Sequence, residues 1–244
     1  MKSHLLISLK SSPSASGKLI CFPYACGNAS MYYRMSQLTG DFLDVFAACM
    51  PGHGGRGEAP SSIEEFAEPF IPLIRQEEGP IFILGYSFGG FIAYELVRRL
   101  KNEANIAGLI LISSPPPNTV KEMDFILDAG DEELYRYTLN CYGFDLNVLT
   151  PFEKSNYFAT LRNDTSAMRK YEFCREAVSV DTLAILGRQE EEPELVQNFH
   201  RWGDYLTCIK YSVIPGTHML IKSHPEELAR ELDAFIKEQI GVRI

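Results

Sequence analysis

The stretch Ile81-Phe82-Ile83-Leu84-Gly85-Tyr86-Ser87-Phe88-Gly89 decides the fold of this chain, because an apolar segment runs directly into a serine between two glycines. A residue at the apex of a sharp strand-to-helix turn holds a strained backbone conformation. Such a turn requires small residues two positions away on either side, and Gly85 and Gly89 meet that requirement. The stretch therefore predicts a buried strand that ends in an exposed serine, Ser87.

The residues after this turn have the periodicity of an amphipathic helix. Apolar side chains recur at spacings of three and four, at Phe88, Phe91, Ile92, Leu96, Val97 and Leu100. Glu95, Arg98 and Arg99 form the polar face of the predicted helix. Ser87 would then lie at a helix N-terminus, whose dipole favours a developing negative charge.

The same alternation of strand and helix continues on both sides of this turn. We expect strands at 18–22, 45–50, 81–84, 107–113, 182–186 and 209–214, and helices at 31–38, 62–75, 88–101, 193–202 and 225–239. Residues 11–17 read as a flexible segment, with the organised domain starting at Lys18. This order predicts one α/β domain over residues 1–244, with a mostly parallel sheet and helices on both faces. Residues 118–178 interrupt it as a helical insertion rich in aromatic and charged residues.

Composition narrows the class of protein further. With 244 residues, a net charge of −9 and a pI near 5.1, the chain offers no basic surface for nucleic acid or for an anionic membrane. Leu5-Leu6-Ile7 is too short for the core of a signal peptide, so we expect a cytoplasmic protein. The six cysteines lack CxxC pairs, which argues against a disulfide framework and against a zinc site.

A serine nucleophile needs a base within hydrogen-bonding reach, and the base needs an acid to orient it. His218 follows the last predicted strand and precedes the last helix, which puts it at the same sheet edge as Ser87. It is the best candidate for the base. The other histidines have plainer interpretations: a frayed end for His4, a solvated loop for His53, a helix surface for His200 and a capped turn for His224.

Three consecutive carboxylates follow the strand at 182–186, and each is a candidate for the acid: Glu190, Glu191 and Glu192. Glu190 is the third residue after Gly187, the usual place for a strand-end acid, and we favour it. The oxyanion of an acyl-transfer reaction needs backbone N–H donors. We expect these donors at Phe88, directly after the nucleophile, and at Ala25, on the loop after the first strand.

Taken together, these segments resemble the type II thioesterases that accompany nonribosomal peptide and polyketide synthetases. The resemblance extends over nearly the whole chain. Its segments are 21–27, 50–56, the GYSFG turn, Arg162-Asn-Asp164, 187–193 and 215–219. The chain departs from the family pattern at two places. Cys26 stands where the family usually has glycine, and Glu190 where it usually has aspartate, with Pro193 two residues later than usual.

The resemblance implies an α/β-hydrolase fold and hydrolysis of aberrant or stalled acyl groups from the phosphopantetheine arm of acyl or peptidyl carrier proteins. It implies no metal or diffusible cofactor, and we expect a monomer. The insertion then reads as a lid, and its apolar residues would line a chamber or form the lid's own core. They are Met123, Phe125, Leu134, Tyr137, Leu139, Tyr142, Phe144, Tyr157, Phe158 and Met168.

Other functions remain open from the sequence, since fold and triad do not set the acyl donor. The chain is alternatively a stand-alone acyl-CoA thioesterase or a carboxylesterase. A third alternative is an enzyme that transfers the acyl group to an amine or alcohol. A binding protein with a lost triad belongs to another class, and Cys26 and the missing aspartate motivate it.

Overall fold

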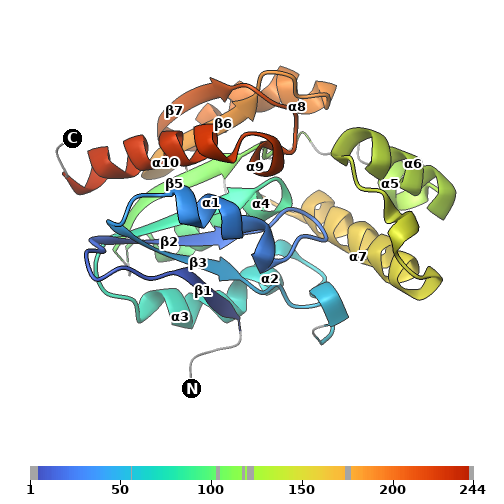
Figure 1. The fold of residues 1–244 in the computed structure, drawn as a ribbon, viewed down its shortest axis with the longest axis horizontal. Helices are drawn as coiled ribbons and strands as arrows, with labels where there is room; N and C mark the ends of the chain where they lie inside the picture. The colour runs from blue at the N-terminus through green and yellow to red at the C-terminus, as the bar shows by residue number, and fades with distance from the viewer. Residues whose placement is uncertain are drawn as a thin grey trace.

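The computed structural model describes residues 5–55, 57–102, 105–116, 119, 124–173 and 177–241. These residues form a seven-stranded sheet in the order β1-β3-β2-β4-β5-β6-β7 (Figure 1). The strands are β1 (Leu6–Lys10), β2 (Gly17–Phe22), β3 (Leu43–Ala48), β4 (Ile81–Tyr86), β5 (Ile106–Ile112), β6 (Val178–Gly187) and β7 (Leu206–Ile214). All neighbours are parallel except β1, which is antiparallel to β3. The predicted α/β fold with a mostly parallel sheet is therefore confirmed.

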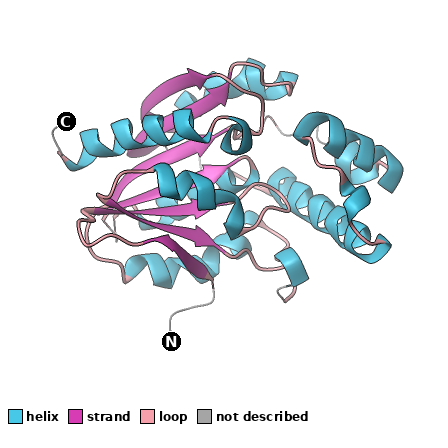
Figure 2. Cartoon of the chain, viewed as in Figure 1, coloured by secondary structure: helices cyan, strands magenta, loops and turns pink. Residues whose placement is uncertain are grey.

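Helices cover both faces of the sheet (Figure 2). One face packs against α1 (Tyr33–Leu38), α9 (Leu220–Ser223) and α10 (Pro225–Ile240). The opposite face packs against α2 (Ile63–Ala67), α3 (Ile71–Arg75), α4 (Phe88–Leu100) and α8 (Pro193–Asn198). Successive side chains of a strand point to opposite faces, so Ile83 joins one core and Leu84 the other. This is why β4 is apolar at nearly every position.

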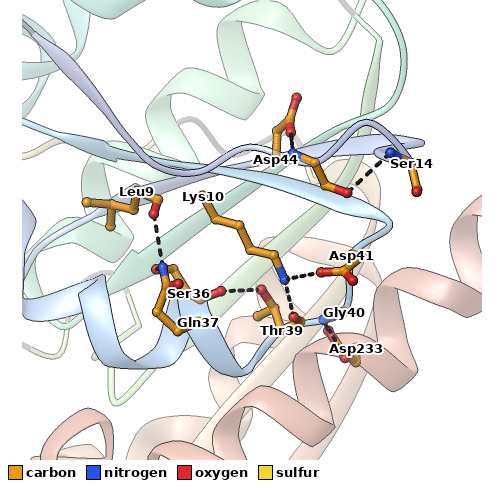
Figure 3. Close-up of polar contacts among 11 residues, drawn as sticks. Leu9, Lys10, Ser14, Ser36, Gln37, Thr39, Gly40, Asp41, Asp44 and Asp233 are labelled. Atoms are coloured by element: carbon orange, nitrogen blue, oxygen red, sulfur yellow. Dashed lines mark hydrogen bonds and ion pairs between the residues drawn. The ribbon is translucent and has the colours of Figure 1, made fainter.

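The N-terminal strand β1 corrects the prediction that the organised domain begins at Lys18. Figure 3 shows Lys10, at the end of β1, reaching toward Asp41 and the carbonyl of Thr39. The Lys10 Nζ–Asp41 Oδ1 distance is 3.1 Å. In the same cluster the amide of Gly40 donates to Asp233 of α10 at 2.9 Å. These contacts fix the edge of the sheet, far along the strands from the predicted serine turn.

Two predicted helices differ from their expected form. The helix expected at 62–75 is broken into α2, a 3₁₀ turn η3 (Glu68–Phe70) and α3, with Pro69 and Pro72 each starting a new segment. Residues 193–202 likewise divide into α8 and a 3₁₀ segment, η6 (Phe199–Asp204). A further 3₁₀ turn, η1 (Ala29–Tyr32), precedes α1.

The polar face predicted for α4 is an ion cluster around one buried carboxylate. Glu95 is fully buried and accepts hydrogen bonds from Arg98 at 2.8 Å and from the Tyr171 hydroxyl at 2.5 Å. Arg99 donates to the same carboxylate. Most of α4 is buried instead of lying on the surface. The buried carboxylate of Glu95 is tolerated because several hydrogen-bond donors surround it.

The insertion between β5 and β6 is helical. It contains α5 (Asp124–Asp128), α6 (Asp131–Tyr142), a 3₁₀ turn η5 (Leu146–Val148) and α7 (Pro151–Lys170). These helices lie beyond the carboxyl ends of the parallel strands (Figure 1). Thr150 and Glu153 form a capping box that starts α7. The insertion has its own small hydrophobic core. Among all the described helices, none is both long and apolar enough to cross a membrane.

Candidate active site

The turn from β4 into α4 carries Ser87 in a strained conformation. Ser87 has φ of 50° and ψ of −115°, a region that residues with a side chain rarely adopt. The turn is tight enough to exclude side chains at the flanking glycines. A Cβ atom on Gly85 would lie 2.3 Å from the Gly89 carbonyl oxygen, and one on Gly89 would lie 2.2 Å from that of Phe22. The predicted requirement for glycine at both positions thus has a direct steric cause.

Neighbouring strands hold this turn in place. The Ser87 N–H donates to the carbonyl of Ile112 at 2.8 Å, and the Ser114 hydroxyl donates to the Ser87 carbonyl at 2.9 Å. Gly90 is a third required glycine, because its Cβ would lie 2.0 Å from Ser114 Oγ. Sequence reasoning did not single out Gly90, although the repeated glycine in Phe88-Gly89-Gly90 was the available signal.

His218 and Glu190 form a buried hydrogen-bonded pair. The Nδ1 atom of His218 is 3.0 Å from Glu190 Oε2, and the exposed fractions of the two side chains are 7% and 0%. The other oxygen, Oε1, accepts the N–H groups of Glu191 and Glu192 at 3.1 and 3.3 Å. Burial raises the pKa of Glu190, but its hydrogen bond to His218, the charge of His218 and the two backbone N–H groups together lower it.

The loops that carry this pair are bonded to each other directly after β6 and β7. Arg188 N–H donates to the Ile214 carbonyl at 2.8 Å, and Gln189 N–H donates to the Gly216 carbonyl at 2.9 Å. Gly216 N–H in turn donates to the Gln189 side chain at 2.6 Å. A Cβ on Gly187 would lie 2.4 Å from the Gly216 oxygen, so glycine is needed where the loops cross. This crossing sets which carboxylate faces His218.

The three neighbouring glutamates have different surroundings. Glu190 faces His218, whereas Glu191 is exposed. Glu192 accepts a hydrogen bond from the Tyr137 hydroxyl of α6 at 2.5 Å. The Tyr137 and Tyr142 hydroxyls are 2.9 Å apart, and the Tyr142 ring lies against that of His218 with centroids 5.2 Å apart. Glu192 thus connects the loop after β6, which carries the three glutamates, to the insertion.

The predicted oxyanion donors both lie beside Ser87. Phe88 is the first residue of α4, so its N–H has no partner within the helix. On the loop after β2, Gly27 N–H donates to the Tyr24 carbonyl at 2.8 Å and Cys26 N–H donates to Asp164 Oδ2 at 2.9 Å. Among the described residues, none accepts a hydrogen bond from Ala25 N–H. Ala25 and Ser87 line the same pocket.

Two pockets meet at Ser87 and His218. The inner one has a volume of about 420 Å³ and the outer one about 780 Å³, each including the part open to solvent. The inner pocket is lined by Tyr24, Ala25, Ser87, Ile126, Tyr142, Phe144, Tyr157, Leu161, Thr165, Met168, His218 and Met219. The outer pocket is lined by Ser87, Pro115, Thr119, Phe125, Ile126, Tyr137, Tyr142, Glu192, Pro193, Glu194, Leu195 and His218. Ser87 and His218 thus face both pockets.

The apolar residues of the insertion divide between pocket and core. Phe125, Tyr137, Tyr142, Phe144, Tyr157 and Met168 line one pocket or both. Leu134 and Phe158 belong to the small core of the insertion, and Leu139 is 37% exposed. Met123 lies outside the described residues.

A thioesterase domain model matches residues 17–236, which is nearly the whole chain and includes the Ser87 turn, the insertion and the loops that carry Glu190 and His218. The chain belongs to the thioesterase domain family. Thioester hydrolysis is the activity of this family and of this chain. The strained Ser87 turn and the His218–Glu190 pair lie inside the matched range.

Known members of this family differ in their biological setting. The chain is 27% identical to the gramicidin S biosynthesis protein GrsT of Aneurinibacillus migulanus, over 86% of this chain and 85% of that protein. It is 25% identical to the medium-chain S-acyl fatty acid synthase thioesterase of Rattus norvegicus, over 97% of this chain and 91% of that protein. The fold matches that of the type II thioesterase BorB from the borrelidin biosynthetic cluster, with a TM-score of 0.82 and 21% identity over 97% and 99% of the two chains.

The prediction that His53 is a solvated loop residue is wrong. A solvated loop histidine is expected from the sequence, yet His53 is 4% exposed and lies 3.1 Å from Asp164 of α7. His200 is exposed, as a helix-surface residue would be, and His4 lies outside the described residues. His224 precedes α10 and contacts Ser223 at 2.9 Å, without a side-chain cap on the helix. Within the described residues there is no cluster of His, Cys, Asp and Glu suited to holding a metal ion.

Proposed function

We propose that this thioesterase is an editing enzyme, which releases aberrant or stalled acyl groups from the phosphopantetheine arm of acyl or peptidyl carrier proteins in nonribosomal peptide or polyketide synthesis. The names of GrsT and BorB tie two similar proteins to such pathways. The observation that carries the acyl-enzyme chemistry is the buried His218–Glu190 hydrogen bond of 3.0 Å beside the pockets that Ser87 lines. The two similar proteins support the choice of a carrier-bound acyl group as the substrate.

In the first half of the reaction, Ser87 becomes acylated. With Nδ1 of His218 bonded to Glu190, the free Nε2 takes the proton of the Ser87 hydroxyl as Oγ attacks the thioester carbonyl. The N–H groups of Phe88 and Ala25 hold the oxyanion of the tetrahedral intermediate. The carbon–sulfur bond then breaks, and His218 returns its proton to the departing pantetheine sulfur, which leaves as a thiol.

In the second half, water replaces the thiol. His218 removes a proton from water, the hydroxide attacks the ester carbonyl, and the same N–H groups hold the second oxyanion. His218 then protonates Ser87 Oγ as the free carboxylic acid departs. Because side chains and backbone groups supply every step, we expect the enzyme to need no diffusible cofactor. We also expect it to be a cytoplasmic monomer.

We assign the two pockets to the two parts of the substrate. The inner pocket is mostly apolar and contains Ala25 beside Ser87, so it suits the acyl group. The outer pocket presents Thr119, Tyr137 and Glu192, which suit the amides and hydroxyl of a pantetheine arm. The arm would then reach Ser87 between the insertion and α8.

The test compares acyl donors that carry the same acyl group. Hydrolysis of an acyl-loaded carrier protein, the matching acyl-CoA and the matching p-nitrophenyl ester is measured with wild type and with Ser87→Ala. The proposal expects the highest kcat/KM for the carrier, with turnover lost in Ser87→Ala. Preference for acyl-CoA or for the ester would favour a stand-alone thioesterase or a carboxylesterase. Product bound to an added amine or alcohol would indicate acyl transfer, and no turnover of any donor would indicate a binding protein.

A further inference from the structure

A second histidine–carboxylate pair lies beside the site, in contact with the loop after β2 and with Phe88. The Nε2 atom of His53 is 3.1 Å from Asp164 Oδ1 and 3.0 Å from Oδ2. The exposed fractions of the two side chains are 4% and 0%. His53 belongs to the loop after β3 and Asp164 to α7, so the pair joins the sheet domain to the insertion. The mechanism proposed above does not use it.

Both members of this pair also hold the loop of residues 24–27, which we call the oxyanion loop. Asp164 Oδ2 accepts the Cys26 N–H at 2.9 Å, and His53 Nδ1 donates to the Gly27 carbonyl at 2.9 Å. Cys26 has a left-handed φ of 61°, which is unfavourable for a residue with a side chain. The two hydrogen bonds lie on either side of the peptide group that joins Cys26 to Gly27. Ala25, whose N–H is the proposed oxyanion donor, is the residue before this anchored segment.

We propose that Asp164 and His53 are positioning residues, which hold the oxyanion loop against α7 so that the Ala25 N–H points at the reacting carbonyl. This inference rests on the proposed function through the role given to Ala25. The pair touches neither the reacting atoms nor the pockets and acts through the backbone of Cys26 and Gly27.

The arrangement couples the position of the insertion to the oxyanion hole. The same helix α7 presents Leu161, Thr165 and Met168 to the inner pocket. Cys26 also contacts α7 through its thiol, which lies 3.4 Å from the Tyr157 carbonyl. A movement of α7 that opens the acyl pocket therefore withdraws the acceptor of the Cys26 N–H. The hole is completed when the insertion is closed over the acyl group.

The hydrogen bonds require a charged His53. One ring nitrogen faces a carbonyl oxygen and the other a carboxylate, so both must carry a proton. Burial lowers the pKa of His53, but the hydrogen bond and charge of Asp164 and the Gly27 carbonyl raise it above its ordinary value. The other groups packed on the ring are Phe66 of α2 and Phe88 of α4.

Substitutions of Asp164 distinguish the loss of its hydrogen bond to Cys26 from the loss of its negative charge. Asp164→Ala removes the acceptor of the Cys26 N–H, and we expect kcat to fall at least about ten-fold with little change in KM. Asp164→Asn preserves the network in neutral form: its oxygen accepts from Cys26, and its amide donates to an uncharged His53. We expect Asp164→Asn to retain most of the wild-type kcat. The matched control is Asp131→Asn, which removes the ion pair of 2.8 Å between Arg162 of α7 and Asp131 of α6, and we expect it to have the wild-type rate.

The pH profile provides a readout that a purely structural role would not change. In wild type, deprotonation of His53 removes one hydrogen bond of the network, so kcat should decline toward high pH. Asp164→Asn no longer needs the charged ring and should lack that decline. Each variant is checked by circular dichroism and thermal unfolding, with the acyl-loaded carrier as substrate between about pH 6 and 9.

Two results would overturn the inference. One is a folded Asp164→Ala enzyme with kcat within two-fold of wild type. The other is the same high-pH decline in Asp164→Asn as in wild type, and this result decides the matter even if Asp164→Ala does not fold. Failure of the proposed function looks different, because the wild-type enzyme would then prefer acyl-CoA or the p-nitrophenyl ester to the carrier, or would turn over none of them.

Discussion

The carboxylate of Glu190 accepts its hydrogen bond from His218 Nδ1 at 3.0 Å, while the adjacent carboxylate of Glu191 is exposed to solvent. A glutamine at 190 would no longer stabilise the imidazolium that forms during the reaction. We expect Glu190→Gln to lower kcat by about 10²- to 10⁴-fold. Single-turnover acylation of Ser87, followed by quench and mass spectrometry, measures this step.

Glu191→Gln is the matched control for the acid, because it makes the same chemical change one residue away. Its rate should stay within about two-fold of wild type, as expected for an exposed side chain outside the hydrogen-bond network. Equal rates for Glu190→Gln and Glu191→Gln would remove Glu190 from the mechanism.

The glycine requirement at the Ser87 turn predicts a large loss of stability. In Gly89→Ala the new Cβ would lie 2.2 Å from the Phe22 carbonyl oxygen, which is backbone of β2 and cannot rotate away. We expect a loss of about 3 kcal/mol in the free energy of unfolding. Urea unfolding followed by circular dichroism measures it.

Gly203→Ala is the control for this effect, because its Cβ would make an ordinary contact of 3.5 Å with Tyr211 Oη. Its free energy of unfolding should lie within about 0.5 kcal/mol of wild type. If Gly89→Ala were as stable as Gly203→Ala, the close approach of the Ser87 turn to β2 would be wrong.

The raised pKa of His53 predicts a pH-dependent contribution to stability. Because this pKa is higher in the folded protein than in the unfolded chain, its contribution is fully present below the unfolded value of about 6.5 and is lost as pH rises through the folded pKa. The stability difference between wild type and His53→Gln should therefore shrink from about pH 5.5 to 9. His200→Gln, at an exposed position, should show no such trend. A difference that grows with pH would have the wrong sign for a histidine stabilised in its charged form.

The thiol of Cys26 should be inert although it lies next to the site. Burial and, to a smaller extent, the charge of Asp164 raise its pKa. Under native conditions at pH 8, iodoacetamide should modify the exposed Cys208 and leave Cys26 unmodified, as peptide mapping would show. Modification of Cys26 as fast as Cys208 would contradict the contact of the Cys26 thiol with α7.

Most of the fold was predictable because its central strands, above all β4 and β5, are apolar at nearly every position and bounded by turns. The strand at 81–84 and the helix at 88–101 match β4 and α4 to within two residues. The misses have physical causes. The edge strand β1 has an exposed, mixed pattern, and its place depends on pairing with β3. The sequence pattern placed Glu95 on a solvent-exposed helix face. Its burial depends on contacts such as the hydrogen bond from Tyr171, which is far away in the sequence.

The candidate site divides in the same way. The placement of Ser87 and His218 follows from local rules, since Ser87 directly follows β4 and His218 lies on the loop after β7, at the same sheet edge. The partner of His218 depends on how the loops after β6 and β7 cross, which is a contact between Gly187 and Gly216 and not a property of either segment alone. The His53–Asp164 pair joins residues 111 positions apart, and no local pattern carries that information.

If Ser87 is the nucleophile, the acyl-enzyme can be trapped on its side chain. Wild-type enzyme is mixed with an acyl-loaded carrier protein, quenched in acid and examined by mass spectrometry. We expect one added acyl group on the peptide that contains Ser87, and neither adduct nor released acid with Ser87→Ala. An acyl group on another residue, or hydrolysis by folded Ser87→Ala at the wild-type rate, would contradict it.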